Sequence, residues 1–191
     1  MTAMKADKKK VLIINGSASE HSSTQKLIDQ LGEWTSGLFT LTFCDALSNL
    51  PHFNPELSIA GTPGSIVQFR QQIQEADGVI ICTPEYIFSI PAGLKNALEW
   101  CVAAPIFSGK VLGIITASAN GAKGHEELQL IMQTLMADFN AATTLLIPGI
   151  KGKINEQGQI TDAVTNTRLE QFLAAFKLLL SNTPVAEEPY S

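Results

Sequence analysis

Five short apolar stretches recur along the chain, and each is bounded by Gly, Pro, Asn or Ser. They are rich in β-branched residues, which is the pattern of strands that are buried on both faces of a sheet. The pattern predicts strands over residues 11–14, 38–43, 79–82, 111–116 and 143–147.

Segments with apolar residues at helical spacing lie between these stretches and after the last one. Strands that alternate with helices imply a parallel sheet with helices on both faces. We therefore expect an α/β chain with a three-layer doubly wound fold and the strand order 2-1-3-4-5. The predicted helices cover residues 24–34, 65–76, 92–103, 126–139 and 161–180.

The chain has 191 residues, of which 45% are hydrophobic and 16% are charged, so it can form one full core. We expect a single domain over residues 10–182, a disordered leader over residues 1–9 and a flexible tail over residues 183–191. Residues 45–63 contain three prolines and no clear period, and we expect them to form a surface excursion.

The net charge and the cysteines exclude several function classes. A formal net charge of −5 argues against a nucleic-acid partner, because such proteins carry a basic face. The three cysteines are widely spaced and odd in number, which supports neither a disulfide framework nor a metal site. The first apolar stretch is too short for a signal peptide or a membrane span. We expect a cytoplasmic protein without a membrane partner.

The loop after the first predicted strand is a candidate anion site. Between residues 15 and 24 it carries five hydroxyl side chains, and it runs directly into a helix whose first backbone amides are free. Neither a G-x-G-x-x-G fingerprint nor the lysine of a P-loop is present, which favours a phosphate monoester. The alternative is that Ser22, Ser23 and Thr24 only cap the helix.

The loop after the third predicted strand is stiffened by Pro84 and Pro91 and holds two aromatic residues, Tyr86 and Phe88. Such a loop can lie along a flat heterocycle and bind its polar edge through the backbone. The alternative is an aromatic loop that packs at the sheet end or at a subunit interface.

Residues 83–100 read T-P-E-Y-x-x-S-x-P-x-x-L-K-N-x-x-x-W, and this string resembles the NADPH-dependent FMN reductase family, which includes quinone, chromate and azo-dye reductases. Gly16, Ser17 and Ser22 and the segment 117–124 match as well. The resemblance implies a flavodoxin-like fold that binds FMN and uses NADPH or NADH as co-substrate. It further implies electron transfer to flavin, quinone or similar acceptors by a ping-pong mechanism, in a homodimer or homotetramer.

The resemblance places the FMN phosphate in the first loop, the ring system against the third-strand loop, and the loop after the fourth strand at the other edge of the ring. It implies no catalytic side chain, because the cofactor carries the redox chemistry. The implied cofactor-binding residues are Ser17, Ser19, Ser22, Ser23, Thr24, Pro84, Glu85, Tyr86, Ile87, Phe88, Ser89, Ser118, Asn120 and Gly121.

Two other functions stay open. A flavodoxin-type electron carrier would share the fold and the cofactor, but it normally uses a strongly acidic docking face. A non-catalytic interaction protein with weakened FMN binding is the other alternative. It is favoured by Ser19, Thr24 and Ile87, where the family pattern commonly has Arg, Asn and Asn. Glu85 is interpreted as a structural contact rather than a catalytic carboxylate, and His125 as a pocket residue or an ordinary polar residue at a helix start.

Overall fold

The computed structural model describes residues 8–19, 21–44 and 47–182. Most of the predicted leader, all of the predicted tail, and positions 20, 45 and 46 lie outside the described residues. The centre is a five-stranded parallel sheet with the order β2-β1-β3-β4-β5, which confirms the predicted fold. The strands are β1 (Lys10–Asn15), β2 (Thr40–Phe43), β3 (Gly78–Thr83), β4 (Val111–Ser118) and β5 (Thr144–Pro148).

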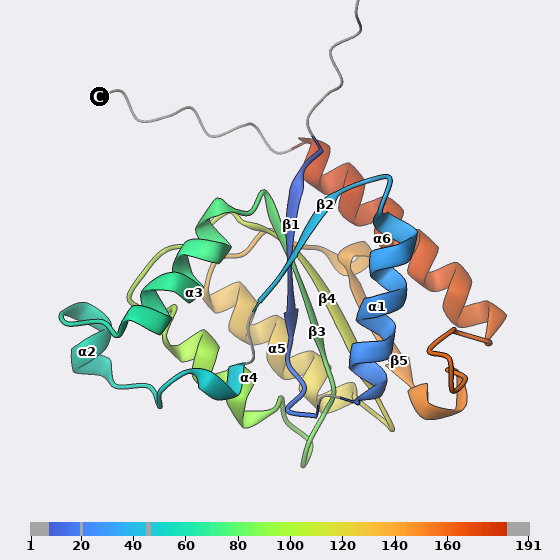
Figure 1. Cartoon of the computed structure of the whole chain (residues 1–191), viewed down its shortest axis with the longest axis horizontal. Coiled ribbons are helices and arrows are strands. Elements are labelled where there is room, and N and C mark those ends of the chain that lie inside the picture. Colours follow the sequence, from blue (N-terminus) through green and yellow to red (C-terminus); the bar gives the residue numbers. More distant parts are fainter. Residues whose placement is uncertain (1–7, 20, 45–46, 183–191) are drawn as a thin grey trace, which may run out of the picture.

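Helices cover both faces of the sheet (Figure 1). The helices α1 (Ser23–Thr35) and α6 (Ala163–Asn182) lie on one face. The other face carries α3 (Gly64–Glu75), α4 (Ala92–Glu99) and α5 (Ala122–Thr134). The side chains of β1 alternate between the two cores: Val11 and Ile13 belong to one buried cluster, and Leu12 and Ile14 to the other. This alternation explains why the run from Val11 to Ile14 is apolar without interruption.

Close packing between α6 and the sheet depends on a glycine in β4. A Cβ atom on Gly113 would lie only 2.7 Å from the ring of Phe172 and 3.2 Å from that of Phe176. Both rings are buried and stack on each other with an interplanar angle of 9°. Glycine at this position therefore lets α6 lie directly against the sheet.

The helix α4 ends earlier than predicted, at Glu99 instead of residue 103. The carbonyl of Trp100 accepts hydrogen bonds from the Arg70 guanidinium, and the Trp100 indole donates to the Pro51 carbonyl at 2.9 Å. These long-range contacts fix the chain after α4. The apolar spacing predicted a longer helix because it reflects which residues are buried and not where the helix ends.

The helix α5 begins at Ala122, four residues before its predicted start, and ends at Thr134 instead of residue 139. Gly121 precedes it with a left-handed φ of 88°, and the carboxylate of Glu85 accepts hydrogen bonds from its first turn. The cap comes from a distant loop, so local sequence carries no signal for it.

Smaller departures occur elsewhere. The strand β2 begins at residue 40, and α6 begins at residue 163 because Asp162 caps it by accepting from the Thr165 amide at 2.8 Å. The predicted excursion contains a 3₁₀-helix, η1 (Leu47–Asn49), and a short helix, α2 (Pro55–Ile59). The N-cap Asn54 followed by Pro55 was a local signal for α2.

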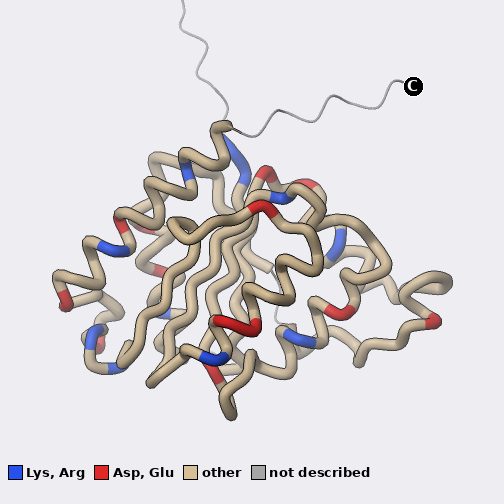
Figure 2. The backbone as a smooth tube through the Cα atoms, turned by 180° about the vertical axis from the view of Figure 1, so that it is seen from behind, with Lys and Arg blue, Asp and Glu red and all other residues tan. Residues whose placement is uncertain are grey.

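Acidic and basic residues are interspersed along the helices and loops of the described chain (Figure 2). Among the described residues, no helix combines the length and the apolar character needed to cross a bilayer.

Candidate functional site

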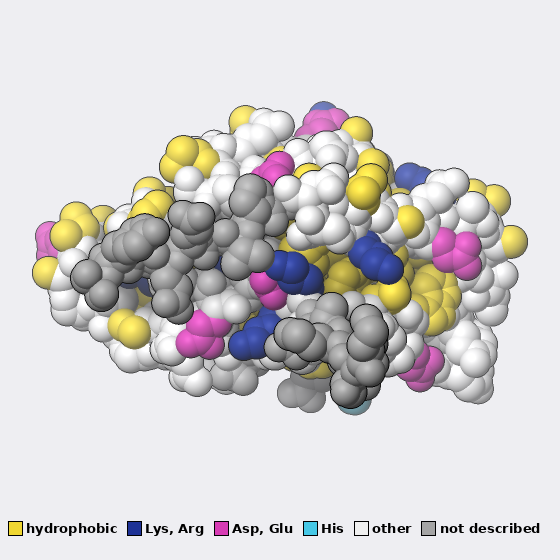
Figure 3. Space-filling model, turned by 90° about the horizontal axis from the view of Figure 1, so that it is seen from above, with side chains coloured by type: hydrophobic (Ala, Val, Ile, Leu, Met, Phe, Trp, Pro, Cys, Tyr) yellow, Lys and Arg dark blue, Asp and Glu magenta, His cyan; other side chains and the backbone are white. Residues whose placement is uncertain are grey.

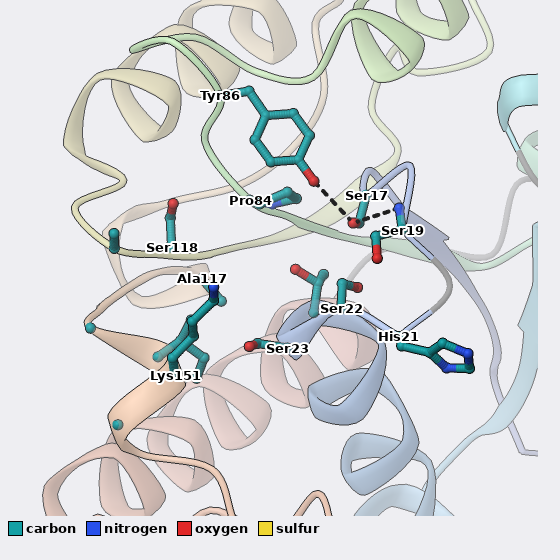
Figure 4. Close-up of a pocket in the computed structure, with 15 residues that line it drawn as sticks. Ser17, Ser19, His21, Ser22, Ser23, Pro84, Tyr86, Ala117, Ser118 and Lys151 are labelled. Atoms are coloured by element: carbon teal, nitrogen blue, oxygen red, sulfur yellow. Dashed lines mark hydrogen bonds between the residues drawn. The ribbon is translucent and has the colours of Figure 1, made fainter. Parts of the chain in front are cut away.

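The carboxyl ends of β1, β3, β4 and β5 open into a cavity of about 620 Å³, a size typical of small-ligand sites (Figure 4). The register of the parallel strands brings these ends together, because Asn15 pairs with Cys82, Thr83 with Thr116, and Ser118 with Pro148. The described residues that line the cavity are Ser17, Ser19, His21, Ser22, Ser23, Thr24, Pro84, Tyr86, Ala117, Ser118, Ala119, Gly149, Ile150, Lys151 and Gly152.

One wall of the cavity follows β1 and consists of serine hydroxyls and the start of α1. Ser22 is the N-cap and accepts a hydrogen bond from the Gln25 amide at 3.0 Å. The first-turn amides at Ser23 and Thr24 have no intrahelical acceptor, and the helix dipole is positive there. This wall is therefore suited to an anion. Thr24 is buried, so we expect it to contribute through its backbone amide.

The position of this wall depends on Gly16. A Cβ atom at Gly16 would lie 2.4 Å from the Thr83 hydroxyl oxygen and 2.9 Å from the Leu94 side chain. Without one, the Gly16 amide donates to the Cys82 carbonyl at 2.8 Å, so the chain leaves β1 directly alongside β3. The loop after β1 thereby comes close to the loop after β3.

The loop after β3 forms a tight hairpin. The amide of Tyr86 donates to the Ser89 carbonyl at 2.9 Å, and the Ser89 amide donates back to Tyr86 at 3.1 Å. Ile87 and Phe88, at its tip, have left-handed φ angles of 52° and 58°, which cost energy for both residue types. The two side chains are 96% and 73% exposed, so burial does not offset that cost. Such strain at a site suggests a functional constraint.

Two carboxylates hold this hairpin against α5. Glu85 accepts from the Gly121 amide at 3.1 Å and from the Gly124 amide at 2.8 Å. Glu127 accepts from the Ser89 hydroxyl at 2.6 Å and from the Ile90 amide at 3.1 Å. Glu85 therefore makes a structural contact, in which its carboxylate caps the start of α5.

The predicted site residues fall into two groups. Those that line the cavity are Ser17, Ser19, Ser22, Ser23, Thr24, Pro84, Tyr86 and Ser118. Those that do not line it are Glu85, Ile87, Phe88, Ser89, Asn120 and Gly121. Tyr86 bridges the two main walls, since its hydroxyl lies 3.4 Å from the Ser17 hydroxyl (Figure 4). Members of the second group hold the hairpin and the start of α5, or lie at the exposed tip.

The sequence interpretation missed the wall after β5. It consists of Gly149 and the 3₁₀-helix η3 (Ile150–Gly152), and it brings Lys151 to the cavity. A signal for it existed: Gly149 and Gly152 frame a lysine after the last strand, at the same sheet edge as the other loops.

His125 is not among the described cavity residues. Its Nδ1 lies 2.8 Å from the hydroxyl of Thr116, inside the contact between α5 and β4. Burial, reinforced by the charge of Arg168, lowers the pKa of His125. It is a packing residue at this position. His21 does line the cavity, but its ring extends away from Lys151 (Figure 4).

The described residues supply neither a reactive thiolate nor a metal site near the cavity. Burial raises the pKa of the Cys82 thiol strongly and that of Cys101 to about 12, so neither is a thiolate at neutral pH. No group of three or more His, Cys, Asp or Glu among the described residues could hold a metal ion.

A second hollow of about 490 Å³ lies between α1 and α6, and Trp34, Leu38 and Leu173 are among its lining residues. Figure 3 views the opposite end of the molecule from the cavity, where apolar side chains and basic side chains (Lys or Arg) are scattered around a shallow hollow. The carboxyl ends of the strands remain the candidate site, because hydroxyl side chains and the first residues of α1 line the cavity there.

The sequence profile of the NADPH-dependent FMN reductase family matches residues 9–147. The chain belongs to this family. An NAD(P)H-dependent FMN reductase of Pseudomonas aeruginosa is 32% identical over 180 residues, which cover 91% of this chain and 96% of that protein. An NADPH:quinone oxidoreductase of Arabidopsis thaliana is 33% identical over 69% of this chain and 70% of its own length.

Solved structures support the same fold for this member of the FMN reductase family. The flavoenzyme NAD(P)H:(acceptor) oxidoreductase of Paracoccus denitrificans superposes with a TM-score of 0.75. The match covers 93% of this chain and 100% of that one, at 24% identity.

Proposed function

We propose that this chain is an FMN-dependent NAD(P)H oxidoreductase that passes electrons from reduced nicotinamide to flavins, quinones or similar small acceptors. The observation that carries the proposal is the cavity, in which a wall of hydroxyls and free amides meets an apolar wall at Pro84 and Tyr86. Membership of the FMN reductase family and the activities named for its relatives support the same class.

The serine wall fits a phosphate monoester, which carries close to two negative charges at neutral pH. The hydroxyls of Ser17, Ser19 and Ser23 and the first amides of α1 are all suitable donors. Ser22 can cap the helix and bind a phosphate at the same time, because its oxygen accepts from the Gln25 amide and its own O–H proton stays available to a ligand. Capping and phosphate binding, the two interpretations of this loop, are therefore compatible.

The opposite wall fits a flat ring. Pro84 is buried and rigid, Tyr86 is 43% exposed, and Ala117 and Ala119 add small side chains that leave the backbone accessible. Glu85 and Glu127 position the hairpin through α5, so these surfaces keep their places without a ligand. We propose that the isoalloxazine of FMN lies against Pro84 and Tyr86.

Bound FMN would supply the two-electron chemistry between a hydride donor and an acceptor. The protein residues then have three tasks: to grip the phosphate, to orient the ring and to limit the access of water. We further propose that reduced nicotinamide and the acceptor bind in turn to the same side of the ring, which gives ping-pong kinetics.

The first experiment is a titration of the purified protein with FMN, followed by anaerobic addition of NADPH and then NADH while visible absorbance is recorded. Tight binding and bleaching of the flavin spectrum support the proposal, and steady-state rates should give parallel double-reciprocal plots. Binding without reduction by either nicotinamide would favour an electron carrier. No binding at high micromolar FMN would favour an interaction protein.

A paired variant locates the ring. We expect Pro84→Ala with Tyr86→Ala to weaken FMN binding about tenfold or more, because the flat apolar wall is lost. The control is Phe43→Ala, which removes a 55% exposed aromatic side chain from β2, outside the cavity. Unchanged FMN affinity in the folded double variant would move the ring elsewhere.

We also propose that the protein assembles as a homodimer or homotetramer. Exposed apolar side chains at the hairpin tip and at Val102, which is 69% exposed, are candidates for a contact between copies. Sedimentation velocity would distinguish these assemblies from a monomer.

A further inference from the structure

We propose that Lys151 binds the phosphate of the bound flavin nucleotide from the β5 side of the cavity. The inference rests on the proposed function, in which the phosphate lies at the start of α1. It gives the phosphate a positively charged partner. Apart from His21 at the edge of the site, the other groups that could donate hydrogen bonds to the phosphate are neutral hydroxyls and amides.

The backbone around Lys151 is fixed. Ile150 is buried in the core on the α1 and α6 face of the sheet, and Gly149 turns the chain with a left-handed φ of 65°. The Gly149 amide donates to the Ala119 carbonyl at 3.1 Å, which ties this segment to the loop after β4. From this position the side chain of Lys151 extends into the cavity (Figure 4).

The charges around the cavity favour an anionic ligand near Lys151. No described residue that lines the cavity is acidic, and Lys151 is the only lysine or arginine among them. No described carboxylate lies within 4.0 Å of its ammonium, whereas Lys9, Lys95 and Lys123 are all paired with acidic side chains. The chain has a net charge of −5, so the charge of the described cavity lining is opposite in sign to that of the whole chain.

The two arginines do not serve this purpose. Arg70 donates to the Trp100 carbonyl and to the Ser58 side chain, on the α3 and α4 side of the sheet. Arg168 lies on α6 and is not among the described cavity residues. A lysine suits the remaining role because its ammonium is a compact charge on a flexible stem, which can reach a phosphate without a preset geometry.

The side chains of the first turn of α1 lie between Lys151 and His21. Ser23 directs its hydroxyl toward the side of Lys151, and His21 lies beyond Ser22 and extends away (Figure 4). A phosphate at the start of α1 would thus have hydroxyls and amides on one side and the Lys151 ammonium on the other. The profile match of the family ends at residue 147, so this lysine lies outside the matched segment.

The test compares two flavins and two lysines. Affinities for FMN and for riboflavin, which lacks the phosphate, are measured by calorimetry on the wild type, Lys151→Met and Lys153→Met. Lys153 lies two residues further on and is not among the described cavity residues. We expect Lys151→Met to weaken FMN binding about tenfold and to leave riboflavin binding unchanged. Lys153→Met should change neither affinity, and Lys151→Arg should retain most of the FMN affinity.

The salt dependence gives an independent readout, because FMN affinity should fall more steeply with ionic strength in the wild type than in Lys151→Met. An unchanged FMN affinity in Lys151→Met, or an equal loss for both flavins, would overturn the role of Lys151. A wild type that binds neither flavin would instead overturn the proposed function, and this is seen before any variant is made. Lys151 is exposed, so the variants are expected to fold, which circular dichroism checks.

Discussion

The loop after β1 and the loop after β3 face each other across the cavity, but they are held by different partners. In the first loop the Ser17 amide donates to the Asn15 side chain, the Ser19 amide to the Ser17 hydroxyl, and the Ser22 amide to the Ser19 carbonyl. All these contacts span no more than three residues. The second loop is held by Glu85 and Glu127 through contacts with α5 that span more than thirty residues.

The difference corresponds to the ligand group that we propose for each wall. Short-range hydrogen bonds shape the first loop, and the hydroxyls of Ser19, Ser22 and Ser23 line the cavity, which suits a group that binds through many donors. Long-range carboxylate contacts make the second loop rigid enough to keep two residues in left-handed conformations at its tip. A flat ring needs such a fixed surface more than it needs donors.

The largest effect is expected from removing the main contact of the second loop. Glu85→Ala should lower the free energy of unfolding by about 2 to 3 kcal/mol, because the Gly121 and Gly124 amides lose a charged acceptor. Denaturant titration measures this change. The matched control is Glu126→Ala, which removes an exposed partner of Lys123 on the same helix and should cost less than about 0.5 kcal/mol. Equal effects of the two variants would mean that the Glu85 contacts contribute little.

A smaller effect is expected from the first loop, where Ser22→Ala should cost about 1 kcal/mol through loss of the N-cap of α1. Ser22→Asp separates the two roles of this residue. It keeps the cap, so thermal stability should stay near that of the wild type, while its negative charge repels a phosphate and weakens FMN binding. If Ser22→Asp bound FMN as tightly as the wild type, the phosphate could not lie at this helix start.

The smallest effect has the opposite sign. Ile87→Asn should raise the free energy of unfolding by about 0.5 to 1 kcal/mol, because asparagine tolerates a positive φ far better than a β-branched residue. The comparison is Ile59→Asn, which replaces a β-branched residue that is 82% exposed and lies outside the positive-φ positions, and it should be nearly neutral. A loss of stability in Ile87→Asn would show that the tip makes contacts that the described chain does not reveal.

The strands were predictable because β-branched runs such as Val79–Cys82 are both apolar and bounded by turn residues, and these two properties are local. Their order was predictable from the count of five strands alternating with helices, which favours the order 2-1-3-4-5 in a doubly wound sheet. The serine loop and the Pro84–Tyr86 wall were predictable from the rule that parallel strands bring their carboxyl ends to one edge. The start of α5 was not predictable, since the amide of Gly121 before this helix donates to the side chain of Glu85, which comes from another loop. Lys151 was missed because a lysine framed by two glycines is a weak signal by itself, and the fold is needed to bring it opposite the serines.

The carboxylate contacts of the hairpin also determine which side of the cavity can adapt to a ligand. Any outward movement of Tyr86 would have to break the contacts of Glu85 and Glu127 together or carry α5 along. The segment from Ser17 to Ser19 is held mainly by local hydrogen bonds, which can exchange one at a time. The ring surface would therefore stay constant from one acceptor to the next, and any adjustment to the flavin itself would fall on the serine side, where its phosphate is proposed to bind.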